Sequence, residues 1–486
     1  MTPDTFGFPD AERQLVDYAS SAKQSPSSPC IQLLDVLRGL AVLAALFISV
    51  WFFGGLSQNG QNGLLLSSKG FDYRLFGTVD ILFDGKMRAL IAIVFGAGML
   101  LFLSKENSLG EKPTQELFIR RQLWLGVFGI VNGLLFLWTR DVLFHLGIMG
   151  ILLFPFFRLP AKGLWLAALA ATLIYCGKYY WNYADDRKTY AKYIAVTEVE
   201  KRIAKDTLGK SKTVTAGKKE VAKKDTLTKK QAEEKEAWEG LLAGMKYDPK
   251  KDSGEKAEMG KTSYASLYEH LMPRLQTREA QWTYQFGIWD FAGAIMLGMA
   301  LFKNRFFTGR FSRSRYLLIG LAGITAGVLL AWVRLHYNQL TLQDYGKYIG
   351  SHTVPYNFFF PFERLTAAVG YASFIAFLLN AGIFSFLWRG LAAVGRLALA
   401  NYLAQSLICT LVFTGFGAGY FGRLTQVQLY LIVLEVCLVQ IVFSTLWLRV
   451  YTIGPAEWLL RSLLYGKRLP LRRRSAALES TTAVLS

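Results

Sequence analysis

Long apolar runs recur along most of this chain, and they limit the folds that are open to it. A helix of roughly 20 apolar residues is long enough to cross the hydrocarbon core of a bilayer. Hydrophobic residues make up 52% of the 486 residues, and the mean hydropathy is +0.26. Because these residues are concentrated in runs with short polar breaks between them, the sequence predicts an all-α, polytopic membrane protein.

We predict about ten membrane helices from the positions of these runs. They lie at residues 32–54, 84–104, 118–138, 141–157, 160–180, 284–303, 314–336, 361–386, 390–418 and 428–451. The chain then divides into an N-terminal tail (1–31), five membrane helices (32–180), a charged and partly helical insert (181–283), five more membrane helices (284–452) and a basic C-terminal segment (453–486).

The net charge of +20 is explained by membrane topology without a nucleic-acid partner. Basic residues gather in alternate loops, as in the stretch from Lys303 to Arg315 and again after residue 466. The positive-inside rule places such loops in the cytoplasm. The sequence therefore predicts that both termini are cytoplasmic and that the insert is extracytoplasmic. The N-terminus has no basic segment followed by a short apolar core, so no cleaved signal peptide is expected.

The insert and the cysteines offer little chemistry. Lys, Glu, Ala and Thr replace the apolar runs from about residue 181, which favours surface helices and a solvated spacer or lid over a catalytic domain. Cys176, Cys409 and Cys437 fall in predicted membrane helices, and Cys30 precedes the first. Their spacing indicates neither a disulfide framework nor a zinc site, so no metal is predicted.

One group of polar residues is expected near the cytoplasmic face. Asp35 and Arg38 are i and i+3 neighbours in the first membrane helix, where unpaired charges are costly. Arg396, Asn401 and Gln405 share roughly one face of a later helix. These residues form either a polar clamp between helices or an inner ligand site, and the sequence favours neither over the other.

A second, larger group is expected on the outer side. It comprises Asp80, Asp84, Lys86, Arg88, Arg140, Asp141, His145, Asp290, Glu363 and Arg364. His145 is the most chemically suggestive member, because Asp141 precedes it by one helical turn and a carboxylate there would orient the imidazole for proton transfer. The alternative is a structural or interfacial histidine.

Four segments resemble the YeiB-like family of bacterial multipass membrane proteins. They are Leu33–Leu40 (Leu-Leu-Asp-Val-Leu-Arg-Gly-Leu), Lys86–Phe102, Gly395–Ser406 and Gly454–Arg461. The Asp-x-x-Arg-Gly pattern is also distantly similar to the transmembrane acyltransferases that include heparan-alpha-glucosaminide N-acetyltransferase. This resemblance implies a bacterial inner-membrane protein that takes an acyl group from cytoplasmic acetyl-CoA or another acyl-CoA. The acceptor would be an envelope glycan, a lipid or a small amine.

The chain departs from the acetyltransferase pattern at one position. Those enzymes are expected to use a histidine in the first outer loop, and Gly54–Phe83 contains none. The leading hypothesis is an acyltransferase in which Asp141 orients His145 as base and the remaining outer residues, apart from Lys86 and Glu363, hold the acceptor. A carboxylate in place of His145, or a different chemistry, is the alternative. A small-solute transporter or exporter and a receptor or assembly protein are the rival functions.

Overall fold

The structure is a computed structural model that describes residues 29–104, 113–211 and 227–472, without the side chains of 206–211. Most of the predicted N-terminal tail and residues 473–486 of the basic C-terminal segment lie outside the described residues. Within these ranges the chain is helical, and its only bridge of strand type is the isolated pair Tyr451–Arg472. The predicted all-α fold is confirmed.

The first half of the chain contains helices of very different lengths. They are α2 (Pro29–Gly54), α3 (Gln58–Ser67), α4 (Gly70–Phe83), α5 (Lys86–Leu103), α6 (Thr114–Leu135), α7 (Leu143–Leu152), η1 (Phe154–Arg158) and α8 (Ala161–Ser211).

The second half begins with short helices and continues with longer ones. They are α9 (Lys229–Met245), α10 (Pro249–Met259), α11 (Tyr264–Thr277), η2 (Arg278–Gly287), α12 (Ile288–Lys303), η3 (Phe306–Thr308), α13 (Arg313–Gln343), α14 (Tyr345–Ser351), η4 (Tyr356–Phe359), α15 (Phe360–Asn380), α16 (Ser385–Arg396), α17 (Ala398–Phe413), α18 (Gln426–Val450) and α19 (Pro455–Tyr465).

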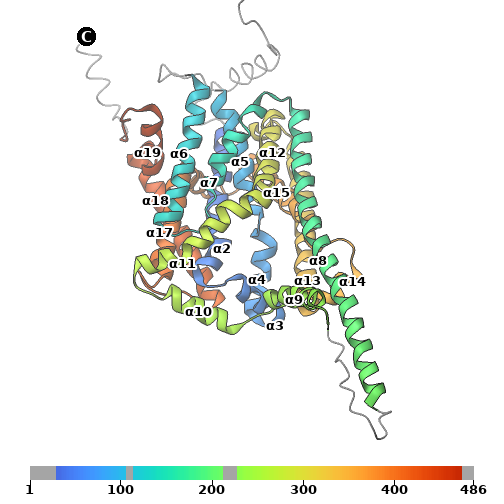
Figure 1. The fold of residues 1–486 in the computed structure, drawn as a ribbon. Helices are drawn as coiled ribbons and strands as arrows, with labels where there is room; N and C mark the ends of the chain where they lie inside the picture. The colour runs from blue at the N-terminus through green and yellow to red at the C-terminus, as the bar shows by residue number, and fades with distance from the viewer. Residues whose placement is uncertain (1–28, 105–112, 212–226, 473–486) are drawn as a thin grey trace, which may run out of the picture.

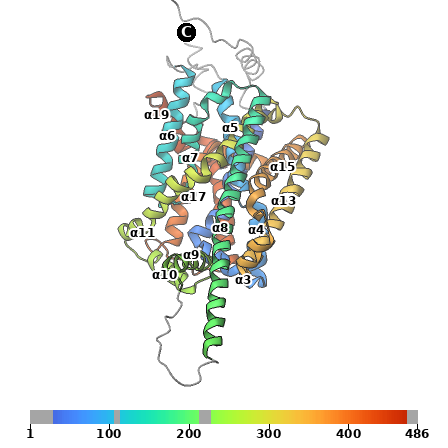
Figure 2. The same ribbon diagram turned by 45° about the vertical axis from the view of Figure 1, so that its right-hand side comes forward.

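The longer helices run side by side along one direction and form a bundle (Figures 1 and 2). Helices α3, α9, α10 and α14 gather at one end of it, which we call the insert end. Helix α19 lies at the opposite end.

Six stretches of the described chain are long and apolar enough to cross a membrane, or seven if the bent pair α16 and α17 is one span. The predicted multipass architecture is therefore confirmed, whereas the predicted count of about ten is not. Only 22% of the apolar stretch of α13 and 28% of that of α18 is buried inside the protein. Both helices thus present apolar surface outward, as lipid contact requires.

Three of the predicted membrane helices are not among these stretches, and their residues form other helical segments. Residues 118–138 lie mostly on α6, and 141–157 divide between the ten-residue helix α7 and the short 3₁₀ helix η1. Residues 161–180 form the first part of α8, which is 51 residues long in total. Because α8 runs through residue 181 and the π-helix η2 runs through residue 283, both predicted boundaries of the insert lie inside helical segments.

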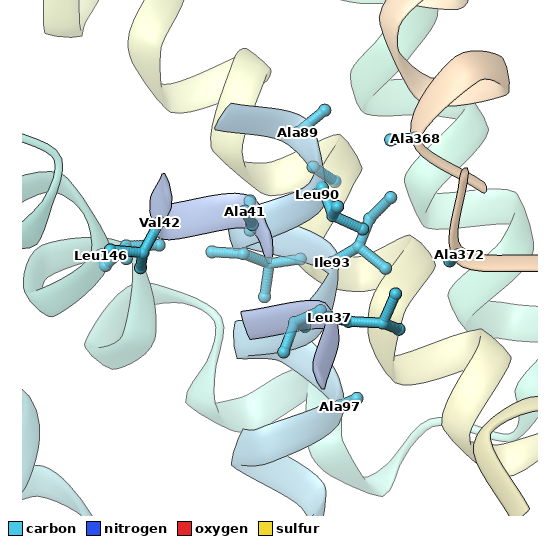
Figure 3. Close-up of a cluster of buried hydrophobic side chains, with 14 of the residues drawn as sticks. Leu37, Ala41, Val42, Ala89, Leu90, Ile93, Ala97, Leu146, Ala368 and Ala372 are labelled. Carbon is cyan, nitrogen blue, oxygen red and sulfur yellow. The ribbon is translucent and has the colours of Figure 1, made fainter. Parts of the chain in front are cut away.

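Apolar side chains pack together inside the bundle. Leu37, Ala41, Leu90 and Ile93 are fully buried, and Figure 3 shows them packed together from α2 and α5. We call these four residues the apolar plug. Beside it, α5 and α12 touch backbone to backbone, since a Cβ on Gly96 would lie 2.1 Å from the carbonyl oxygen of Ile295. Close contact of this kind is usual where small residues meet between membrane helices.

Candidate functional site

A break between α4 and α5 creates the candidate site. The two helices form one apolar stretch, Gly70–Leu103, but Asp84 and Gly85 interrupt it. Gly85 has φ +68°, and a Cβ on it would lie 2.8 Å from Cζ of Phe360. Both features favour glycine at this position. An interrupted membrane helix is tolerated where it lines a cavity, and Asp84 does line one.

Two cavities lie next to one another toward the insert end of the bundle. The deep cavity, of about 390 Å³, is lined in part by residues of α2 to α5. Its polar lining residues include Asp80, Asp84 and Arg334. The wide cavity, of about 520 Å³, is lined largely by α11 and by residues 137–140. Their walls share Phe52, Gln58, Trp138, Arg140, Arg278 and Trp282.

A buried ion-pair network holds four helices around the deep cavity. Lys86 Nζ lies 2.6 Å from Oε1 of Glu363, and both side chains are buried. Arg334 donates from Nε to Oε2 of Glu363 at 2.9 Å and from Nη2 to Oδ2 of Asp80 at 2.8 Å. The network joins α4, α5, α13 and α15. Paired in this way, charges within the bundle avoid the large cost of isolated burial.

A second network fixes Arg88. Its Nε and Nη2 both lie 3.0 Å from Oδ2 of Asp290, the first acidic residue of α12. Asp290 also contacts Nη1 of Arg364, and both of these side chains are buried. One carboxylate therefore serves two guanidinium groups, of which only Arg88 lines the deep cavity.

Two further arginines have no carboxylate within ion-pair distance among the described residues. The guanidinium carbon of Arg140 lies 3.5 Å from the ring centre of Phe52, and that of Arg278 lies 3.2 Å from the ring centre of Trp282. Arg140 lies in the loop between α6 and α7. Its burial, and then the nearby positive charge of Arg88, lowers the pKa of its guanidinium to about 10.

Asp84 is the less constrained of the two acidic residues that line the deep cavity. Asp80 makes close bonds to Arg334, whereas Oδ2 of Asp84 lies 3.8 Å from Nη2 of the same arginine. The Asp84 side chain is also 29% exposed, against 8% for Asp80. Its carboxylate therefore has room to bond a ligand.

His145 is buried and lines neither cavity. Its Nδ1 lies 3.0 Å from the backbone carbonyl oxygen of Asp141, which can only accept, so Nδ1 carries a proton. Nε2 lies 2.7 Å from the Thr283 hydroxyl, in η2. The Asp141 carboxylate instead accepts from Asn132 and from the backbone N–H of Phe144. The expected pairing of this carboxylate with the imidazole does not form, because the helix directs it to other donors.

The predicted inner residues bond in separate sets. Arg38 pairs with Asp35 at 3.0 Å, and Arg396 donates to the backbone carbonyl of Thr452, just beyond the C-terminal end of α18. Gly395 brings α16 against the backbone of Asp35. Asn401 donates to Ser444, and Gln405 donates to Gln440, which in turn donates to the backbone of Asn401. These amides form a hydrogen-bonded clamp between α17 and α18.

The predicted outer residues are brought together more closely. Asp80, Asp84, Arg88 and Arg140 all line the deep cavity. Asp290 pairs with both Arg88 and Arg364, and neither Asp290 nor Arg364 lines that cavity. Asp141 bonds groups of α6 and α7, and His145 bonds a hydroxyl of η2. No group of three or more His, Cys, Asp or Glu side chains within the described ranges is arranged to hold a metal ion.

Sequence reasoning missed two arginines of the site. Arg334 lies in the predicted membrane helix 314–336, where an isolated guanidinium is itself a signal of a buried polar partner. Arg278 lies near the end of the insert, and no local pattern distinguishes it from the other basic residues there. Its place in the site depends on the path of α11 and η2 across the bundle.

Comparisons with known proteins identify relatives but no activity. A family model described as "Protein of unknown function (DUF418)" matches residues 301–467. "Uncharacterized protein YxaH" of Bacillus subtilis is 26% identical over 94% of this chain and 99% of its own length. "Uncharacterized protein YeiB" of Escherichia coli is 26% identical over 88% of this chain and 95% of its own length. No solved structure matches the chain.

Proposed function

We propose that this chain, which belongs to a YeiB-like family of uncharacterised proteins, is a membrane acyltransferase whose acceptor binds in the deep cavity. The observation that supports this most is the composition of the cavity wall. It combines an incompletely bonded carboxylate, Asp84, with the guanidinium groups of Arg88 and Arg140. Acyl transfer needs a base for the acceptor and positive groups for the developing oxyanion, and this wall contains both.

In the proposed reaction, Asp84 accepts the proton of an acceptor hydroxyl or amine. The freed electron pair attacks the thioester carbonyl carbon of acyl-CoA, with acetyl-CoA as the simplest donor. The new bond to carbon forms, the C–S bond breaks, and the thiolate leaves and takes up a proton. The N–H groups of Arg88 and Arg140 that do not hold the acceptor stabilise the negative charge on the carbonyl oxygen between these steps. Asp141 and His145 act at a distance by holding α7 against η2.

We further propose that the protein lies in the bacterial inner membrane with its insert end outside. The basic residues Lys303, Arg305 and Arg313 flank the turn between α12 and α13, and the positive-inside rule favours a cytoplasmic place for such a turn. In this orientation an envelope glycan, a lipid or a small amine reaches the deep cavity from outside. The donor comes from the cytoplasm, so the apolar plug must open during turnover.

The test is transfer of label by the purified full chain in lipid nanodiscs. Isotope-labelled acetyl-CoA and envelope extract are supplied, and products are followed by mass spectrometry. Asp84→Asn should lower transfer by about 100-fold or more, the usual contribution of a general base. Asp72→Asn, a change in the same helix at a position that lines neither cavity, is the matched control and should keep the activity. Full transfer by Asp84→Asn, or none by the wild type, would refute the proposal.

A transporter is the second candidate, and the apolar plug is the observation that favours it. Packed apolar residues near a cavity, such as Leu90 one residue before the lining residue Ile91, are what a transporter that is open to one side would need on the other side. The two functions differ in their products, because a transporter moves its solute without covalent change. Uptake of labelled solutes into proteoliposomes, followed by mass spectrometry of the solute, separates them.

A further inference from the structure

We infer that the junction of the two cavities binds a phosphate group of the acceptor, an inference that rests on the proposed function and specifies its substrate class. We call Arg88, Arg140, Arg278 and Trp282 the arginine junction. Arg140, Arg278 and Trp282 line both cavities, and Arg88 lines the deep one. An anion held there would lie between the two spaces.

The aromatic rings fix the direction in which these guanidinium groups can bond. Arg278 and Arg88 lie 3.2 and 5.4 Å from the centre of the same Trp282 ring, and Arg140 lies 3.5 Å from that of Phe52. A guanidinium that stacks on a ring keeps its N–H groups in the plane, free for acceptors at its edge. Nε of Arg278 is buried and has no hydrogen-bond partner. The junction therefore has preorganised donors that protein groups do not satisfy.

The nearby carboxylates do not neutralise the junction. Asp290 pairs with Arg88 but is shared with Arg364. Asp84 lies 3.8 Å from Arg334 and acts on Arg88 and Arg140 only through longer-range attraction. Glu279 lines neither cavity and forms no ion pair with Arg278, although the two charges attract one another. Two of the three junction arginines thus lack an ion-pair partner in the described part of the chain.

A phosphate group matches this arrangement better than a carboxylate does. Three guanidinium groups supply many in-plane donors. The tetrahedral phosphate of a monoester, with three unesterified oxygens, or of a diester, with two unesterified and two ester oxygens, can meet them from several directions, whereas the two oxygens of a carboxylate accept in one plane. The spaces of about 390 and 520 Å³ on either side leave room for an extended molecule with the phosphate between its ends. Such a phosphate belongs to either a lipid headgroup or a soluble phosphate ester.

Direct binding to the purified full chain tests this inference independently of turnover. For the soluble source, calorimetry compares glycerol 3-phosphate with glycerol. For the lipid source, native mass spectrometry compares phosphatidylglycerol with diacylglycerol, which lacks the phosphate. Arg140→Gln and Arg278→Gln are the test variants, and thermal unfolding confirms that each is folded. Arg274→Gln is the matched control, because Arg274 also lines the wide cavity but pairs with Glu255.

We expect one of the two phosphate compounds to bind the wild type. Each test variant should weaken that binding about tenfold or more through loss of a charge-assisted hydrogen bond, while Arg274→Gln should not. Glycerol and diacylglycerol should not compete. Absence of binding by both phosphate compounds, or equal binding by the folded test variants, would overturn the inference. If the phosphate compounds bind as expected but no acyl transfer is detected, the inferred phosphate site stands and the proposed acyltransferase function is refuted.

Discussion

The buried pair of Lys86 and Glu363 allows a sharp test of how the bundle is stabilised. The two partners are not equivalent. Lys86 has one acidic partner, Glu363, and a weaker bond of 3.3 Å to the carbonyl oxygen of Asp84. Glu363 also bonds Arg334 at 2.9 Å, and that arginine retains Asp80 when Glu363 is lost. Removal of the glutamate charge therefore leaves Lys86 buried without an anion, whereas removal of the lysine leaves Glu363 paired.

The expected magnitudes follow from this asymmetry. Glu363→Gln should lower the free energy of unfolding by about 3–5 kcal/mol, the cost of breaking a buried pair and leaving one charge uncompensated. Lys86→Met should cost about 1.5–3 kcal/mol, the contribution of one hydrogen bond to a charged group. The double variant removes the uncompensated lysine, so it should be more stable than Glu363→Gln alone.

Equilibrium unfolding in mixed detergent micelles, followed by tryptophan fluorescence, measures these differences. The control is Glu116→Gln, which breaks the exposed pair with Arg120 and should change stability by about 0.5 kcal/mol or less. The reasoning is wrong if Lys86→Met costs as much as Glu363→Gln. It is also wrong if the two costs simply add in the double variant, because the partners would then be uncoupled.

Three further predictions use the same measurement. Gly85→Ala should destabilise the protein by about 2 kcal/mol, since alanine is strained at positive φ and meets Phe360, whereas Gly126→Ala, with no atom within 4 Å, should be neutral or mildly stabilising. Glu457→Ala should cost about 1–2 kcal/mol, because its carboxylate accepts the first N–H groups of α17, and an unchanged stability would exclude this capping role. Trp238→Ala should cost about 3–5 kcal/mol by emptying the aromatic cluster of α8, α9 and α14, and a loss below 1 kcal/mol would contradict that packing.

The sequence predicted the membrane class, whereas the predicted count of about ten spans is not confirmed. Length and hydropathy identify an apolar run, yet they do not show whether one straight helix occupies it. The run at 390–418, predicted as one helix, contains the end of α16 and all of α17, which meet at an angle of 81°. Glu457, far along the chain in α19, caps the second helix and satisfies the backbone groups that the bend frees. A local pattern cannot reveal a partner that is supplied by tertiary contact.

The candidate site was predicted in part for a similar reason. Charged residues inside apolar runs are rare enough to mark the deep cavity, and Asp80, Asp84 and Arg88 were found in this way. His145 looked like a base because Asp141 lies four residues before it. The backbone carbonyl oxygen of Asp141, and not its carboxylate, faces the imidazole ring. Helix α7 starts at Leu143, and the carboxylate accepts a backbone N–H at that helix start.

The two groups of charged residues differ in what the backbone does beside them. Next to Asp35 and Arg38, Gly39 permits an unbroken helix to contact α16 so closely that a Cβ would lie 2.0 Å from a backbone oxygen. Next to Asp84 and Arg88, Gly85 instead breaks the helix and leaves space. Arg38 approaches Gly98, and the helical rise puts Gly98 roughly 15 Å from Arg88 along α5, with Leu90 and Ile93 between them. A donor from the side of Arg38 must therefore displace this packing. Substitutions that place larger side chains in the apolar plug, and still allow the bundle to pack, should slow acyl transfer. They should not weaken phosphate binding at the arginine junction.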